Sequence, residues 1–119
     1  MIPRYSRERM NAIWSPENRY QKWLDIEIRA CEAMARRGEI PKASLRQIKA
    51  KAGFDVARID EIEKTTKHDV IAFLTSVTES VGEAGRYIHM GLTSSDILDT
   101  SLAMLLKEAA EILIEDMDQ

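Results

Sequence analysis

The chain has 119 residues, with 17 Lys and Arg against 20 Asp and Glu, and its formal net charge is −3. This balance argues against a nucleic-acid-binding protein, because phosphate contacts require a surplus of Lys and Arg on one face. The length suits one domain of ordinary size, large enough to bury a core without disulfides or metal.

The sequence contains no recognisable secretory leader and no apolar run near the roughly 18 residues that a membrane helix requires. We therefore expect a cytoplasmic protein that does not enter a membrane. Its single cysteine, Cys31, cannot form an internal disulfide, and its apolar surroundings predict a buried thiol. The only histidines are His68 and His89, and no group of His and Cys has the spacing of metal ligands, so we predict no metal site.

The composition predicts an all-α fold. The sequence has only 5 glycines and 3 prolines, and Ala far outnumbers Val; both features favour helix over sheet. Ser6 is expected to cap a short first helix. Ser15 followed by Pro16 is a stronger helix start, since Ser is a good N-cap and Pro suits the first helical position. Apolar residues then recur at three- and four-residue spacing as far as Gly38, and only Glu27 interrupts that stripe.

Three more helices are predicted between residues 41 and 82. Pro41 opens the first of them, which ends near Gly53. Asp55 is expected to cap the second. Asp69 is expected to cap the third, whose apolar stripe is closed by Gly82. A short segment over residues 85–92 leads to a polar capping cluster at residues 93–96.

The last helix, predicted over residues 97–117, is unusually apolar. Its expected inward stripe is Leu98, Leu102, Leu105, Ala109, Ile112 and Leu113, widened by Met104, Leu106, Ala110 and Ile114. Such a helix needs neighbours on several sides, as in the centre of a bundle or a subunit interface. Its C-terminal acids oppose the helix dipole, and no stop signal follows them. We expect the helix to continue in a longer protein; the alternative is a terminal helix that docks in a homodimer.

Three polar clusters lie at predicted helix starts or just before them. They are Arg4 with Tyr5, residues 67–69, and residues 89–95. Helix N-termini present free N–H groups and partial positive charge, which suit carboxylates and phosphates. The alternative is that these residues are ordinary helix caps and that the histidines are solvated. The residue types alone indicate an anion site on a helical scaffold and identify no ligand.

The sequence motifs in these clusters resemble those of the adenylosuccinate lyase family of the fumarase/aspartase superfamily, and the resemblance covers essentially the whole chain. The resemblance is carried by residues 4–6 (RYS), 12–14 (AIW), 67–73 (KHDVIAF) and 91–100 (GLTSSDILDT), in the family's order and spacing. It implies an all-α fold with an N-terminal helical domain over residues 1–92. Residues 93–119 would then begin the central helical-bundle domain.

The resemblance also implies an activity. Members of this family eliminate fumarate from adenylosuccinate to give AMP, and from the succinylated carboxamide ribotide earlier in purine biosynthesis. They need no metal or organic cofactor. They are homotetramers in which long helices form a central bundle and three subunits build each active site.

The resemblance assigns substrate-binding roles to Arg4, Tyr5, Lys67, His68, Asp69, His89, Thr93 and Ser94. Arg4 and Tyr5 would hold the nucleotide phosphate, with His89 on the same side. Thr93 and Ser94 would bind the succinyl or fumaryl carboxylates. The three residues from 67 to 69 would line the pocket, and the histidine among them would support general-acid chemistry.

The sequence departs from the family in length. Family members are much longer. They carry a Thr-His motif whose histidine is the proton donor, and a Gly-Ser-Ser-x-Met-Pro loop whose serine is the general base. Neither motif occurs in this sequence, so we expect the 119-residue chain alone to be inactive. Two alternatives are a sister lyase acting on a non-nucleotide succinyl substrate, and a non-enzymatic helical module that dimerises through residues 98–113.

Overall fold

The regular structure of this chain is entirely helical in the computed structural model, which describes residues 2–118. This confirms the expected all-α fold. In chain order the elements are η1 (Pro3–Tyr5), α1 (Glu8–Ile13), α2 (Pro16–Arg36), α3 (Lys42–Lys51), α4 (Val56–Thr66), α5 (Asp69–Val81), η2 (Glu83–Tyr87) and α6 (Ser94–Met117).

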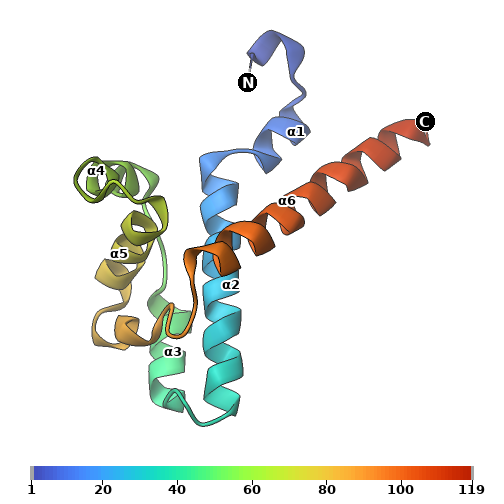
Figure 1. The fold of residues 1–119 in the computed structure, drawn as a ribbon. Coiled ribbons are helices and arrows are strands. Elements are labelled where there is room, and N and C mark those ends of the chain that lie inside the picture. Colours follow the sequence, from blue (N-terminus) through green and yellow to red (C-terminus); the bar gives the residue numbers. More distant parts are fainter. Residues whose placement is uncertain (1, 119) are drawn as a thin grey trace.

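Helix α2 is the axis of the molecule (Figure 1). The helical body from α3 to η2 lies on one side of α2, with α4 packed against α5 and α3 alongside α2. Helix α6 starts at this body, crosses α2 and runs outward on the other side, where α1 lies against it. One long helix therefore connects the main body to the N-terminal segment.

The main core centres on aromatic rings from three parts of the chain. Tyr20 and Trp23 of α2 meet edge to face, with centroids 5.1 Å apart, and Phe73 of α5 lies 5.4 Å from Trp23. Phe54, in the α3–α4 connection, closes the group 6.1 Å from Phe73. Such pairs add to the burial of large apolar surfaces, so this cluster fixes α5 against α2.

A second, smaller apolar cluster joins α1 to the outer half of α6. It consists of Ile13, Leu105, Ala109 and Ile112, with Met10 packed against it. Around it, Arg9 pairs with Glu115 at 2.8 Å and Arg7 pairs with Asp116. Two of the acids that oppose the dipole of α6 are thus compensated by arginines from the N-terminal segment.

Several predicted helix ends are confirmed. The Ser15 side chain accepts from the backbone N–H of Asn18 at 3.2 Å, with Pro16 as first helical residue, and Gly82 ends α5. The expected cap at Ser6 is wrong. Helix α1 begins at Glu8, and the Ser6 hydroxyl instead donates back to the carbonyls of the preceding turn.

Only part of the apolar surface of α6 is buried against the rest of the chain. The expected inward stripe is confirmed at Leu105, Ala109 and Ile112, which are buried. It is wrong at Leu102 and Leu113, which are 48% and 55% exposed, while Ile97 and Ser101 are buried instead. The exposed apolar side chains of α6 are Leu102, Leu106, Leu113, Ile114 and Met117, called here the outer face of α6. In the described part of the chain, no helix combines the length and apolarity needed to cross a membrane.

Candidate functional site

The start of α5 carries the first predicted site histidine. His68, not Asp69 as expected, is the N-cap, and its ring Nδ1 accepts from the backbone N–H of Ile71 at 3.2 Å. Because Nδ1 is an acceptor there, a neutral His68 carries its proton on Nε2. The ring is about half exposed, with 47% of the side chain accessible. Its Nε2–H is therefore a proton donor at the surface.

Asp69 and Lys67 flank this histidine in different ways. The Asp69 carboxylate accepts from the backbone N–H of Val70 at 2.7 Å, which occupies a second free N–H group at the start of α5. Lys67 ends α4 in the left-handed conformation, at φ 55°, with its side chain exposed. His68 is thus flanked in sequence by an exposed lysine and by a half-exposed carboxylate whose Oδ1 lies 3.8 Å from the His68 Nδ1.

The second predicted site histidine is held from inside the protein. His89 lies in the loop between η2 and α6, in the left-handed conformation at φ 66°. Its Nδ1 is 2.6 Å from Oε1 of Glu27, a residue of α2 that is 1% exposed. Burial raises the pKa of the Glu27 carboxyl, and the hydrogen bond and charge of His89 act in the opposite direction.

The start of α6 carries the predicted carboxylate-binding residues. Thr93 is the N-cap, so the helix begins three residues earlier than expected. The Asp96 carboxylate accepts from the Thr93 backbone N–H at 2.8 Å and from its hydroxyl at 3.1 Å. These bonds lower the pKa of Asp96. Ser94 is the first residue of α6 and is half-buried. An internal carboxylate therefore occupies the two Thr93 donors that the sequence assigned to a ligand carboxylate.

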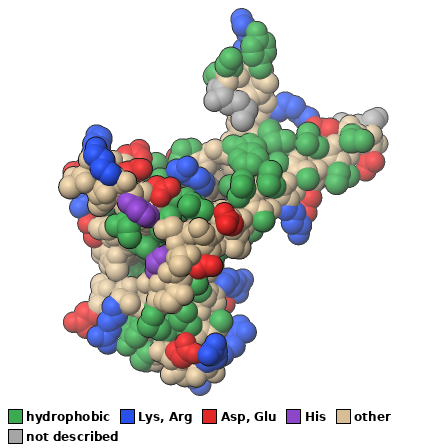
Figure 2. Space-filling model, viewed as in Figure 1, with side chains coloured by type: hydrophobic (Ala, Val, Ile, Leu, Met, Phe, Trp, Pro, Cys, Tyr) green, Lys and Arg blue, Asp and Glu red, His purple; other side chains and the backbone are tan. Residues whose placement is uncertain are grey.

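A surface depression brings the start of α5 next to the first turns of α6. Its volume is about 320 Å³. The residues that line it are Trp14, Arg19, Trp23, Asp69, Leu98, Asp99, Ser101, Leu102 and Leu105. Both histidines of the chain are visible on one face of the molecule (Figure 2). Asp69 is the one predicted site residue that lines this depression, whereas residues 89–94 lie outside its lining.

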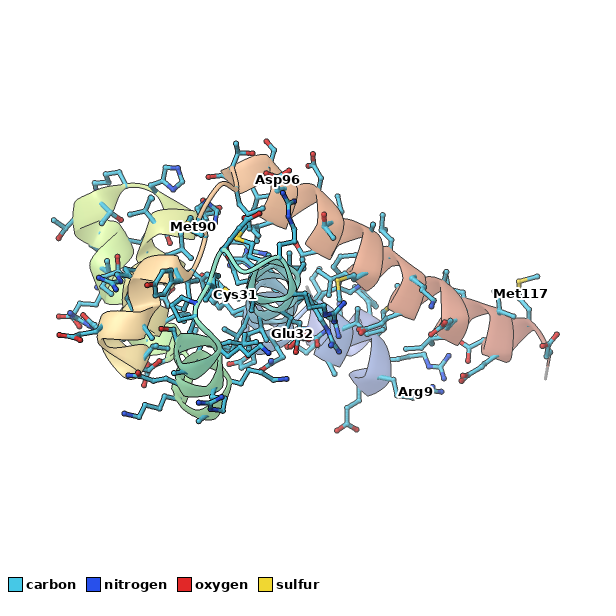
Figure 3. All side chains as sticks on the ribbon, turned by 90° about the horizontal axis from the view of Figure 1, so that it is seen from below. Arg9, Cys31, Glu32, Met90, Asp96 and Met117 are labelled. Carbon is cyan, nitrogen blue, oxygen red and sulfur yellow. The ribbon has the colours of Figure 1, made fainter. Side chains whose placement is uncertain are left out.

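Arg4 and Tyr5 do not join that group. They form the exposed turn η1, in which the Arg4 guanidinium lies over the Tyr5 ring and donates to its hydroxyl at 2.7 Å. The segment that follows is tied to the far end of α6 by the Arg7–Asp116 pair. In Figure 3, Asp96 and Met117 mark the two ends of α6, and Arg9 lies beside its outer half. A helix of 24 residues spans about 36 Å, which separates the two groups within one chain.

Sequence reasoning did not assign Glu27 to the site. The available signal was its position as the one charged residue in the apolar stripe of α2. A buried carboxylate needs a partner, and the partner is 62 residues away in sequence, so no local pattern identifies it. Among residues 2–118, no three His, Cys, Asp or Glu side chains are grouped closely enough to hold a metal ion.

Comparison with known proteins finds relatives that are lyases. A family model described as Lyase matches residues 4–119. The whole chain is 53% identical to adenylosuccinate lyase of Bacillus subtilis (strain 168) and 51% identical to that of Aquifex aeolicus (strain VF5). It covers 28% of the length of each of these relatives.

Among solved structures, fumarate lyase from Mesorhizobium sp. BNC1 has a similar fold. The TM-score is 0.77 at 23% sequence identity, over 87% of this chain and 26% of that one. At this identity the likeness concerns the fold alone.

Proposed function

This chain belongs to the lyase family, and from that premise we propose that the protein carrying it cleaves adenylosuccinate into AMP and fumarate. The proposal rests on one observation: over its whole length the chain is about half identical to lyases named for this substrate. The same enzyme would act on the succinylated carboxamide ribotide of purine biosynthesis. We propose a cytoplasmic homotetramer that needs no cofactor.

The reaction is an elimination. A base removes a proton from the carbon next to a carboxylate, the neighbouring C–N bond breaks, and its electron pair stays on the nitrogen, which an acid protonates. Negative charge builds up beside the carboxylate in the transition state, and fixed donors and cations stabilise it. The chain would contribute those donors and cations, while the principal acid and base would come from other parts of the enzyme.

The geometry supports particular roles for the residues of the main body. His68 presents an accessible Nε2–H, which suits an accessory acid next to the exposed Lys67. Ser94 and the first turn of α6 would bind a carboxylate of the substrate. Thr93 would contribute its donors only after Asp96 releases them, since both are hydrogen-bonded to that carboxylate. Asp69 would lie at the edge of the pocket towards α6.

The position of Arg4 and Tyr5 supports an assembly of several copies. Both are exposed, and the segment that follows them is tied to the outer half of α6, away from the main body that carries His89 and Thr93 (Figure 1). If these residues hold one substrate, at least two copies must contribute to each site. The outer face of α6 provides apolar surface for such an assembly.

The test is fumarate release from adenylosuccinate, measured for the full-length protein that carries this sequence and for the 119-residue chain. We expect turnover by the first and none by the second. In the full-length protein, Arg4→Met should raise KM about tenfold or more, because a charge-assisted phosphate contact is lost. Arg36→Met, at the exposed end of α2, is the control. Cleavage restricted to a succinyl amine without a nucleotide would instead identify a sister lyase.

A further inference from the structure

Resting on the proposed function, we propose that Glu27 is a positioning residue for His89. Its buried carboxylate accepts the Nδ1 proton of the imidazole, which fixes the ring so that Nε2–H can donate to an anionic group of the substrate. Glu27 touches no substrate in this arrangement and acts only through the histidine.

The contact requires a proton between two groups that are both removed from solvent. Glu27 is 1% exposed, and its Oε1 lies 2.6 Å from Nδ1. Its second oxygen, Oε2, is buried with no hydrogen-bond partner among the described residues. A buried carboxylate is costly, and replacing it by an apolar side chain would often be neutral for stability. The observed pairing is therefore better explained by what it does to the histidine.

Helix α2 holds the His89 loop at two successive turns. One turn beyond Glu27, the Cys31 thiol lies 3.8 Å from the carbonyl of Tyr87. His89 and Gly91 both have positive φ, at 66° and 76°, so this loop has a tightly defined path. With Nδ1 directed at the buried carboxylate, Nε2 is the ring nitrogen left for a ligand, and 18% of the side chain is accessible.

Two carboxylates interact with the His89 ring. Besides Glu27, the group that interacts with it is Asp96 of α6, whose pKa is lowered chiefly by Thr93 and to a lesser degree by the charge of His89. The Cys31 thiol, whose pKa is raised to about 11, stays neutral beside Glu27. Imidazolium has a donor at each nitrogen, so in that form the ring can donate to Glu27 and to a substrate anion at the same time.

Nitrogen-15 NMR of histidine-labelled chain tests the proton position directly. His68 serves as the internal contrast, because its Nδ1 accepts a backbone hydrogen bond and its proton belongs on Nε2. We expect His89 to show a protonated Nδ1, and we expect Glu27→Gln to loosen this proton position so that the Nε2-protonated tautomer is also populated. An unprotonated Nδ1 in the wild-type chain overturns the proposal, since Glu27 would then be the donor.

Kinetics of the full-length protein separate positioning from a merely structural role. Glu27→Gln should raise KM for adenylosuccinate about tenfold and change kcat much less. Glu27→Asp, which keeps the charge, should restore part of the loss. Glu32→Gln, at a surface ion pair on the same helix, is the matched control. A lowered melting temperature with unchanged KM overturns the proposal. Absence of turnover in the wild type defeats the proposed function but leaves the NMR result decisive for Glu27.

Discussion

Tyr20 and Phe73 stack across the α2–α5 contact, with ring centroids 5.7 Å apart and planes 5° from parallel. Phe73 also meets the rings of Trp23 and Phe54 and has no accessible surface. It is thus the shared member of the aromatic cluster that places the start of α5, with His68, on the main body.

Phe73→Ala should lower the free energy of unfolding by about 3–5 kcal/mol, because the cavity left at the centre of the cluster cannot be refilled by its neighbours. Urea denaturation followed by tryptophan fluorescence measures the change. Ile71→Ala, on the same helix at a side chain 45% exposed, should cost far less. Equal losses at the two positions would contradict the central role of Phe73.

Gly85 is required by the approach of η2 to α5. A Cβ added there would clash with the Thr78 methyl group and lie 3.3 Å from the Thr78 Cα. The Thr78 hydroxyl is bonded to the Leu74 carbonyl, which fixes the methyl group in place. Gly85→Ala should cost about 1–3 kcal/mol by overpacking.

Removing the Thr78 methyl group tests whether its clash with the new Cβ causes the loss of stability in Gly85→Ala. Thr78→Ser in the Gly85→Ala background should recover a large part of the lost stability, and chemical denaturation of the four variants in a double-mutant cycle measures the coupling. Gly53→Ala, where an added Cβ meets nothing within 4 Å, is the control. Simple additivity of the two changes would show that the clash is not the cause.

Cys31 should be unreactive in the folded chain. Burial and the charge of Glu27 raise its pKa to about 11, so at pH 8 only about a thousandth of the thiol is ionised. Alkylation by iodoacetamide should be slow at pH 8 and accelerate as pH rises towards 11, whereas chain unfolded in urea should react as an ordinary thiol. Rapid labelling of the folded chain at pH 8 would mean that the thiol is open to solvent.

Local patterns were sufficient where neighbouring residues decide the structure. Ser15 with Pro16, Asp55 and Gly82 mark helix ends as expected, since each acts within one turn. Reasoning failed at His68, because an imidazole can cap a helix as an acceptor and the adjacent Asp69 is the commoner cap. The buried face of α6 was predicted only in part, correctly at Leu105, Ala109 and Ile112 and wrongly at Leu102 and Leu113. Its apolar residues surround the helix, so only the packing against α2 and α1 decides which of them are buried.

The candidate site shows the same division. The three clusters were identified from sequence, but the pairing of Glu27 with His89 joins residues on separate elements and needs the fold. The separation of Arg4 from the other site residues likewise depends on the direction of α6. Sequence motifs mark candidate side chains, and the path of the chain determines which of them can meet.

The outer face of α6 should drive self-association. Leu106 and Leu113 are 53% and 55% exposed on it, and Ile114 is 59% exposed. Sedimentation equilibrium at tens of micromolar should show oligomers of the chain, and Leu106→Glu should dissociate them, because burying the new charge in an interface is costly. Lys107→Gln, on the neighbouring exposed position, changes the net charge equally and should leave association intact. A monomeric wild-type chain would contradict the prediction.

The distance that α6 places between Arg4 and His89 has a genetic consequence. If each site draws these residues from different copies, an Arg4→Met protein and a His89→Gln protein are each defective at every site, yet a mixed assembly contains some sites with both native residues. Co-expression of the two defective alleles should therefore restore part of the activity, measured as growth without purines. Two alleles altered at His68 and His89, which lie on the same body of one chain, need not complement in this way.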